Sequence, residues 1–426
     1  MKKLIPIFIL FLFSCKKDIE TISATQQKVT TSTQLIDTIG YKVNQSELLL
    51  SKQNDFGKSY WKNVGVPGDI MVSIFQSKVG FLNQISYGDF NNDGYIDIYN
   101  AGSSYKGPYS NSTFLVWNIS TKKYDSKNLY NNPSDSIFGG NKNHVVPAYL
   151  NDDNYVDYVI FDNGDEGFDN SPNEPVRLVL SDGKGKYDLK EITTNESEPN
   201  VHHKDGGDVG DLNNDGIPDL VITCSNEYYV YWGIKSFPYF SQTNREKHPM
   251  SSTISRTTNA FIGDINKDKN NDIIFAGAED IPNTYHFLIT NNQSIRLPFN
   301  PSSYVANEDY IIDDFNGDGL TDLISINHDL YGNRWWGFST YLQQTDGSFK
   351  LDSNTFQYMN KSRNDGTKFS MFYCDINNDG KKDIGYYDGA DNGQLKDKTI
   401  FIREGNQFVE KDYYQFDLYA KVKMGK

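Results

Sequence analysis

Residues 211–219 read DLNNDGIPD and run directly into the apolar segment Leu-Val-Ile-Thr at 220–223. Carboxylate or amide side chains occupy positions one, three, five and nine of this stretch, and Gly216 occupies position six. Hard cations such as Ca²⁺ take roughly six to eight oxygen ligands, and alternate side chains around a glycine turn supply most of them. Position seven, Ile217, would add a backbone carbonyl. Because Asp, Asn and Gly also dominate turns that hold no metal, a single copy would be weak support for a cation site.

The pattern occurs six times along the chain, and we number the copies loop 1 to loop 6. They are DFNNDGYID (89–97), YLNDDNYVD (149–157), DLNNDGIPD (211–219), DINKDKNND (264–272), DFNGDGLTD (314–322) and DINNDGKKD (375–383). Successive starts are 60, 62, 53, 50 and 61 residues apart, near the period of a four-stranded propeller blade. This self-similarity predicts a single repeat domain.

An EF-hand is the main alternative, because its loop begins with the same spacing of Asp, Asn and Gly. That loop closes with a bidentate Glu at position twelve. The six copies have instead Asn100, Ile160, Ile222, Phe275, Ser325 and Tyr386 at that position. The residues before and after each copy are β-formers, so we expect each loop to join two strands.

The pattern D-x-N-x-D-G-x-x-D followed by a short apolar strand resembles the calcium loops of the FG-GAP/VCBS repeats. Those repeats build the β-propellers of integrin α-subunits and of many bacterial surface proteins. The resemblance covers residues 84–408 and implies an all-β fold, a β-propeller. It says little about activity, since function resides in sites grafted onto folds.

Seven blades is the number that we favour for a propeller domain over residues 39–426. Six blades would carry the loops. Residues 46–62 have the form of a hairpin, like 176–190 and 399–411, and residues 415–424 could add an inner strand to it. These two ends would close the ring as a composite seventh blade. Six blades with the N-terminal hairpin packed against them are the alternative.

Composition and charge suit this fold and argue against a nucleic-acid partner. Aromatic residues make up 14% of the chain, including 29 Tyr and 26 Phe, which favours packed strands. The net charge is −15, from 41 basic and 56 acidic residues, whereas nucleic acids require basic patches. Much of the acidic excess lies in the six loops, where divalent cations would offset it.

The N-terminus predicts a bacterial lipoprotein. Two lysines precede an apolar run that ends at Phe13, and Cys15 follows. The run is too short to span a bilayer, and residues 1–15 resemble a lipoprotein signal in which Cys15 becomes the lipidated first residue. Residues 16–38 are polar and predict a flexible tether, and their first five resemble a surface-export signal of the Bacteroidetes. We expect an outer-membrane lipoprotein at the cell surface, attached to the membrane only by its lipid.

Two further cysteines, Cys224 and Cys374, fall in strands three copies apart. In a closed ring they would lie on different blades, beyond the reach of a disulfide. We expect buried free thiols.

The number of ligands ranks the loops as cation sites. Loops 1, 3, 5 and 6 keep every donor, whereas loop 4 places Lys269 where a left-handed glycine is favoured, at a cost of about 1 kcal/mol. Loop 2 has Tyr149 in place of the first carboxylate, and it is either empty and held by Asx-type hydrogen bonds or occupied. We expect about four to five structural Ca²⁺ ions, favoured over Mg²⁺ because the donors are flexible and mixed. The predicted ligands are Asp89, Asn91, Asp93, Tyr95 and Asp97; Asp211, Asn213, Asp215, Ile217 and Asp219; Asp264, Asn266, Asp268 and Asp272; Asp314, Asn316, Asp318, Leu320 and Asp322; and Asp375, Asn377, Asp379, Lys381 and Asp383.

The segments that enter the first strand of each repeat would lie on the face opposite the loops, and they are rich in His, Arg and Lys. With the aromatic residues of a nearby connection, they predict a binding or adhesion module for a glycan or a surface protein. The candidate ligand-binding residues are His202, His203, Arg334, Trp335, Trp336 and Arg363.

The alternative is a polysaccharide lyase or a related carbohydrate-active enzyme. Some lyases are propellers in which His and Tyr remove a proton beside a uronate carboxylate that Arg neutralises. The candidates here are His144, His203 and Arg256, although no lyase signature matches residue by residue.

Overall fold

The computed structural model describes most of residues 85–412. The longest segments left out between these limits are 102–111, 163–174, 193–205, 278–286 and 297–304, and residues 1–84 and 413–426 are also outside the description. The predictions for Cys15, for the tether and for the two segments of the composite blade therefore lie outside the described residues. Within the described part of the chain, no helix is long and apolar enough to cross a membrane.

The described residues form four-stranded antiparallel sheets, each following the order of its strands in the chain. Sheet 1 contains β1 (Ile85–Gly88), β2 (Asp97–Asn100), β3 (Thr113–Asn118) and β4 (Lys123–Lys127). Sheet 2 contains β5 (Lys142–Ala148), β6 (Asp157–Asp162), β7 (Val176–Ser181) and β8 (Tyr187–Ile192). Sheet 3 contains β9 (Gly207–Gly210), β10 (Asp219–Cys224), β11 (Glu227–Tyr231) and β12 (Arg245–Pro249).

Three more sheets follow in the chain. Sheet 4 contains β13 (Thr257–Gly263), β14 (Asp272–Gly277), β15 (Phe287–Thr290) and β16 (Gln293–Arg296). Sheet 5 contains β17 (Val305–Asp313), β18 (Asp322–Asp329), β19 (Trp336–Gln343) and β20 (Phe349–Asn360). Sheet 6 contains β21 (Thr367–Cys374), β22 (Asp383–Ala390), β23 (Leu395–Glu404) and β24 (Gln407–Asp412). Two short 3₁₀ helices, η4 (Pro133–Ser136) and η5 (Gln242–Asn244), lie in connections.

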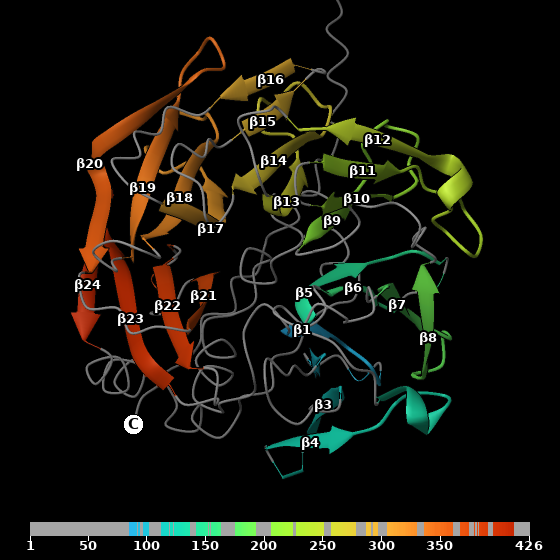
Figure 1. Ribbon diagram of the computed structural model, residues 1–426. Coiled ribbons are helices and arrows are strands. Elements are labelled where there is room, and N and C mark those ends of the chain that lie inside the picture. Colours follow the sequence, from blue (N-terminus) through green and yellow to red (C-terminus); the bar gives the residue numbers. More distant parts are fainter. Residues whose placement is uncertain are drawn as a thin grey trace, which may run out of the picture.

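The sheets are arranged around a common centre, with the fourth strands β8, β12, β16, β20 and β24 at the periphery (Figure 1). The first strands of consecutive sheets contact one another, as β1 does with β5, β5 with β9, β9 with β13, and β13 with β17. Radial antiparallel sheets with the first strand innermost define a propeller. The predicted all-β propeller is therefore confirmed.

The number of sheets differs from the seven blades that the sequence favoured. Within residues 85–412 there are six four-stranded sheets, and each contains one of the six loops. The proposed seventh blade combined residues 46–62 with 415–424, which no local motif ties together and which lie outside the described residues. The described sheets thus correspond to the motif copies alone.

The core lies between neighbouring sheets and is rich in aromatic side chains, as the composition predicted. Between sheets 1 and 2 the rings of Tyr99 and Tyr158 stack with their centroids 4.7 Å apart. Phe90 of loop 1 meets Phe114 edge to face, with centroids 5.1 Å apart, and both side chains are fully buried. Similar clusters follow between sheets 2 and 3, sheets 3 and 4, and sheets 4 and 5.

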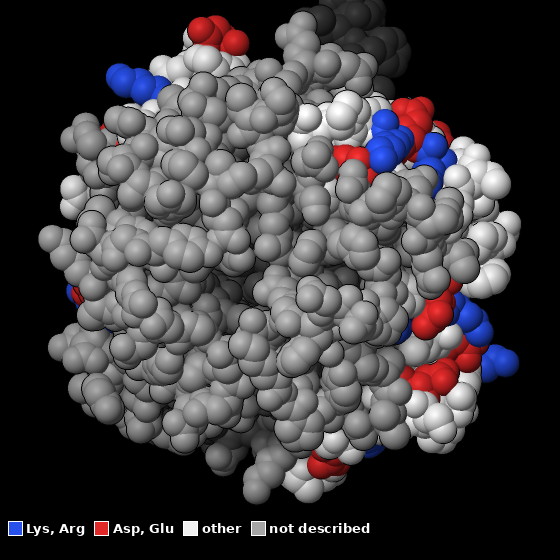
Figure 2. All heavy atoms as spheres, in the orientation of Figure 1, with Lys and Arg blue, Asp and Glu red and all other residues white. Residues whose placement is uncertain are grey.

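The outer strands carry charged side chains. Strand β12 reads REKHP and lies at the free edge of sheet 3, where Glu246, Lys247 and Pro249 are exposed and Arg245 and His248 are partly buried. On the face shown in Figure 2, described Lys, Arg, Asp and Glu side chains are interspersed around the rim. Mixed charge on an edge strand opposes pairing with another chain.

Cys224 ends β10 and is a buried cysteine that is not part of a disulfide, as predicted. Cys374 ends β21, and its side chain lies outside the described residues.

Candidate metal-binding loops

Each loop connects the first strand of a sheet to its second strand. Position nine is the first residue of the second strand in every sheet, as Asp97 is in β2 and Asp219 is in β10. Because the six sheets share one strand order, all six loops lie at the same end of the propeller. The prediction of strand-linking loops, rather than EF-hands, is confirmed.

The aspartate at position nine ties three strands of its sheet together. It is at most 2% exposed in all six loops. In loop 3, Asp219 Oδ2 accepts the N–H of Leu212 at 2.8 Å, and Oδ1 accepts the N–H of Gly233, just beyond β11, at 2.8 Å. The same two contacts, between 2.7 and 3.0 Å, occur at Asp97 (Phe90 and Trp117), Asp157 (Leu150 and Ser181) and Asp322 (Phe315 and Gln343).

This role was missed from the sequence, which assigned position nine only as a cation ligand. In a sequence, an aspartate that binds a cation cannot be told from one that accepts backbone hydrogen bonds. The N–H donor on the third strand is also 14 to 24 residues away along the chain. Its recurrence at position nine, where turn chemistry alone does not require an acid, was the available signal.

Positions one, three and five turn their oxygens toward the inside of the loop. In loop 3, Asp211 Oδ1 and Asn213 Oδ1 both accept the N–H of Asp215, at 3.1 and 3.0 Å. Asp211 Oδ2 accepts the N–H of Gly216 at 2.8 Å. The position-one carboxylates of loops 4 and 5, Asp264 and Asp314, make the equivalent contacts. Three neighbouring loops thus gather the same oxygens around the same backbone.

The backbone of position six is left-handed, as the motif predicts. Gly216 and Gly319 have φ of 79° and 85°, and Lys269 in loop 4 adopts φ of 75°. The expected strain at Lys269 is therefore present. Position four is also left-handed, at Asn214 (φ 61°) and Lys267 (φ 61°), which the sequence reasoning did not anticipate.

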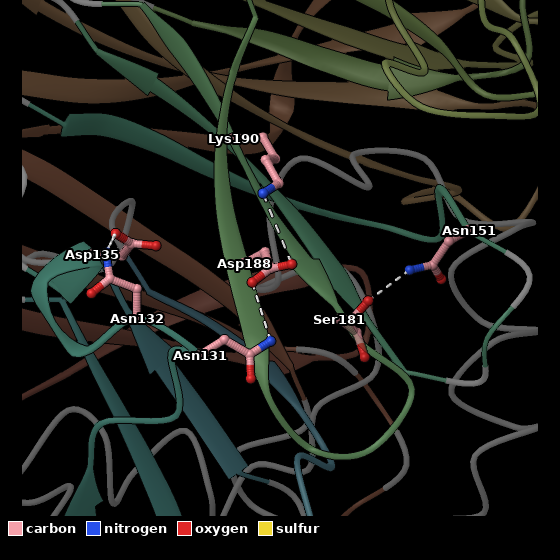
Figure 3. Close-up of polar contacts among 7 residues, drawn as sticks. All are labelled: Asn131, Asn132, Asp135, Asn151, Ser181, Asp188 and Lys190. Atoms are coloured by element: carbon pink, nitrogen blue, oxygen red, sulfur yellow. Dashed lines mark hydrogen bonds and ion pairs between the residues drawn. The ribbon is translucent and has the colours of Figure 1, made fainter.

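Loop 2 departs from this pattern. Asn151 Nδ2 donates to the carbonyl of Ser181 at 2.9 Å, a contact to the third strand that Figure 3 shows. In loop 3 the equivalent amide of Asn213 donates to the position-five carboxylate at 3.1 Å. The N–H of Tyr155 donates to Asp153 Oδ1 at 2.8 Å, as the N–H of Ile217 does to Asp215 Oδ1 in loop 3, so this Asx-type hydrogen bond does not distinguish loop 2 from the other loops. Whether loop 2 also holds a cation stays a prediction.

The carboxylates of a loop are close enough to repel one another. Burial raises the pKa of Asp97 to about 8, and the charges of Asp89 and Asp93 add to this effect. Burial raises the pKa of Asp157 to about 7 and that of Asp322 to about 6, against the lowering effect of their backbone hydrogen bonds. A cation between the carboxylates would relieve the repulsion.

The donor set of these loops fits a hard cation with a mixed oxygen shell. Among the described residues, no three His, Cys, Asp or Glu side chains come together as a metal cluster. A cation would therefore depend on the carboxylates of positions one and five, the amide oxygen of position three and a backbone carbonyl. Such a mixture suits Ca²⁺ better than the strict octahedron of Mg²⁺.

Most of the candidate ligand-binding and catalytic residues lie outside the description. These are His202, His203, Arg256, Arg334, Trp335 and Arg363, together with Tyr95, Asp375 and Asn377 of the predicted metal ligands. The backbone of His144 pairs with Phe161 in β5–β6, and that of Trp336 pairs with Asn360 in β19–β20. Both residues lie near strand ends away from the loops. Their roles stay predictions.

Comparison with known proteins finds a family model that matches two segments of the chain. Residues 211–275 and 314–386, which include loops 3 to 6, match the family model of the FG-GAP-like repeat. A T-cell immunomodulatory protein homolog of Plasmodium falciparum (isolate 3D7) is 26% identical over 272 residues, covering 56% of this chain. The chain spans only 36% of that relative's length.

Among solved structures, an ulvan lyase of a polysaccharide lyase family has a TM-score of 0.40 at 10% identity, over 78% of this chain and 81% of its own. A hypothetical protein from Leishmania major has a TM-score of 0.29 at 10% identity, over 60% of this chain and 84% of its own. Likeness at this level does not extend to function.

Proposed function

Since this chain is a β-propeller that contains FG-GAP-like repeats, we propose that it is a Ca²⁺-stabilised binding platform. The observation that carries the proposal is the repetition of one inward-facing oxygen set in successive sheets, at Asp211, Asp264 and Asp314. A brace between strands is needed in every sheet, whereas a catalytic centre is needed once.

Ca²⁺ would occupy about four to five of the loops, with loops 1, 3, 5 and 6 binding most tightly. Loop 4 would bind more weakly because Lys269 holds a left-handed backbone. In each loop the ion would supply positive charge among carboxylates that repel one another. Its role is structural: it holds the first and second strands of a sheet in place.

The ligand would bind at the face opposite the loops, through His202, His203, Arg334, Trp335, Trp336 and Arg363. Cationic and aromatic side chains suit an anionic glycan, because a sugar ring presents its C–H face to an aromatic ring and its acid group to Arg or Lys. The platform would be held at the outer membrane by a lipid on Cys15. Loss of labelled palmitate from a Cys15→Ser variant would support that anchor.

Binding is tested with the protein lacking its signal, on a panel of immobilised neutral and uronate-rich polysaccharides. We expect Ca²⁺-dependent retention of a subset of glycans, weakened by Arg363→Ala. Retention of none would contradict a glycan-binding platform. New absorbance from unsaturated sugar ends, abolished by His203→Ala, would identify a lyase instead.

A further inference from the structure

Two side chains of third strands reach across to the loop of the preceding sheet. Gln343, the last residue of β19, is 3% exposed, and its N–H donates to Asp322 Oδ1 at 2.9 Å. Its side-chain Nε2 donates to the carbonyl of Ile265, position two of loop 4, at 3.3 Å. Its Oε1 accepts the N–H of Thr321 at 3.1 Å. Gln343 thus joins loop 5 of its own sheet to loop 4 of the sheet before.

Arg403 makes the equivalent connection one sheet later. Its N–H donates to Asp383 Oδ1 at 2.8 Å, and its Nη2 donates to the carbonyl of Phe315, position two of loop 5, at 2.9 Å. The guanidinium also lies over the rings of Phe315 and Phe408, 6.0 and 5.8 Å from their centroids. Gln and Arg at one structural position therefore make the same contact.

The strand register shows that the two positions correspond. The residue that follows position nine is Leu323 in sheet 5 and Ile384 in sheet 6. Leu323 pairs with Tyr341 on the third strand, and Ile384 pairs with Phe401. Gln343 and Arg403 each lie two residues after that partner, so they occupy the same position in their sheets. The corresponding residues of sheets 2 and 3 are Ser181 and Gly233, whose N–H groups donate to the position-nine aspartate in the same way but which have little or no side chain to extend. In sheet 1 the corresponding residue is Trp117, and the flexible polar side chains at this position, among the described residues, are those of Gln343 and Arg403 in sheets 5 and 6.

These contacts leave position two of loops 4 and 5 fixed at both polar groups. The N–H of Phe315 donates to Asp322 Oδ2 at 3.0 Å in its own sheet, while its carbonyl accepts from Arg403. Ile265 is held in the same way, by Asp272 at 2.9 Å and by Gln343. The carbonyl of position two and the N–H of position three belong to the same peptide group. The orientation of that carbonyl therefore helps to set the direction in which the side-chain amide oxygen of Asn266 or Asn316, the proposed cation ligand, points.

We propose that Gln343 and Arg403 are positioning residues for the cation sites of the preceding sheet: Gln343 for loop 4 and Arg403 for loop 5. The inference rests on the proposed Ca²⁺ binding. It attributes the Ca²⁺ affinity of loop 4 and of loop 5 partly to a residue of the next sheet. Its consequence is a site that is complete only when the next sheet is docked.

The test is a calorimetric Ca²⁺ titration of the full chain and of Arg403→Met, which removes both the donor and the charge. If Arg403 holds the position-three ligand of loop 5 in place, Arg403→Met should weaken Ca²⁺ binding at that one site about tenfold, or by about 1.4 kcal/mol. Simple charge repulsion by Arg403 predicts the opposite, tighter binding. Arg403→Gln should retain most of the affinity, because Gln343 already makes this contact with a glutamine.

The affected site is identified by a double-mutant cycle. In an Asp314→Ala, Asp318→Ala background, which removes loop 5, Arg403→Met should have no further effect on Ca²⁺ binding. Lys411→Met is the matched control, because it removes a basic side chain of the same sheet that lies on the outer strand β24 and pairs with Glu404 at 2.8 Å.

The outcomes separate the inference from the proposed function. Absence of Ca²⁺ binding by the unaltered chain overturns both. Normal binding by the unaltered chain with unchanged affinities in Arg403→Met overturns the inference alone. If Arg403→Met does not fold, Gln343→Met decides the question at loop 4, with Asp264→Ala, Asp268→Ala as its background.

Discussion

Two aspartates of one loop are expected to differ in what they stabilise. Asp219 at position nine is buried and accepts two backbone N–H groups, whereas Asp215 at position five is exposed at the loop surface. Replacing a buried acceptor by an amide turns an NH₂ group toward one of those N–H donors, and an unsatisfied buried donor costs about 1–3 kcal/mol. Position nine is thus needed with or without a cation.

Asp219→Asn should therefore lower the free energy of unfolding by about 2 kcal/mol in chelator as well as in Ca²⁺. Asp215→Asn should have little effect in chelator, because its remaining oxygen still accepts the N–H of Ile217, and a clear effect in Ca²⁺. Urea unfolding in both conditions measures the contrast. Equal behaviour of the two variants would show that position nine is only a ligand.

The left-handed lysine of loop 4 offers a gain in stability. Lys269 is exposed with φ of 75°, a conformation in which glycine lacks the penalty of a Cβ. Lys269→Gly should raise the free energy of unfolding by about 0.5–1 kcal/mol, reduced by the greater freedom of glycine in the unfolded chain. Lys184→Gly, at an exposed lysine outside the left-handed region, is the control and should destabilise. Thermal unfolding in chelator measures both, and a loss of stability in Lys269→Gly would contradict the assignment of strain.

At the scale of whole sheets, the hairpin tip between β7 and β8 docks onto loop 1 of the neighbouring sheet. Gly185, between β7 and β8, has φ of 83°, and a Cβ there would lie 2.8 Å from the carbonyl of Phe90 in loop 1. Gly347, between β19 and β20, has nearly the same φ of 81°, but a Cβ there would meet nothing within 4 Å. Comparing substitutions at these two glycines therefore separates the cost of a left-handed backbone, which both share, from the cost of contact between sheets, which only Gly185 has.

Gly347→Ala should cost about 1 kcal/mol from φ alone, whereas Gly185→Ala should cost a further 1–3 kcal/mol or so from overlap with loop 1. The difference in free energy of unfolding, measured with urea, reports the docking of sheet 2 on sheet 1. Equal costs would mean that the hairpin moves away from Phe90 without loss.

The sequence was sufficient for features that depend on local spacing. Strand, loop and strand follow from the apolar runs around each motif, and the strain at Lys269 follows from its alignment with Gly216. The partners of distant contacts could not be predicted from local spacing: recurrence marked Asp219 as important, but its bond to Gly233 and the contact of Arg403 with Phe315 depend on which strands pair. The seventh blade failed to gain support for the same reason, since it joined the two ends of the chain without a motif.

For the molecule as a whole, the loops predict that stability depends on Ca²⁺. An ion that binds only the folded state stabilises it by RT ln(1 + [L]/Kd), about 2.7 kcal/mol per site at a hundredfold excess over Kd. Several such sites would together exceed the stability of many domains.

The melting temperature of the protein should therefore fall by well over 10 °C when chelator replaces millimolar Ca²⁺, and Mg²⁺ should restore only part of it. Differential scanning calorimetry measures the shift. Because bound Ca²⁺ offsets part of the net charge of −15, high salt in chelator should recover some of the loss through screening alone. A melting curve that chelator leaves unchanged would mean that the inward-facing oxygens are satisfied by their backbone N–H groups, and that the loops are turns rather than metal sites.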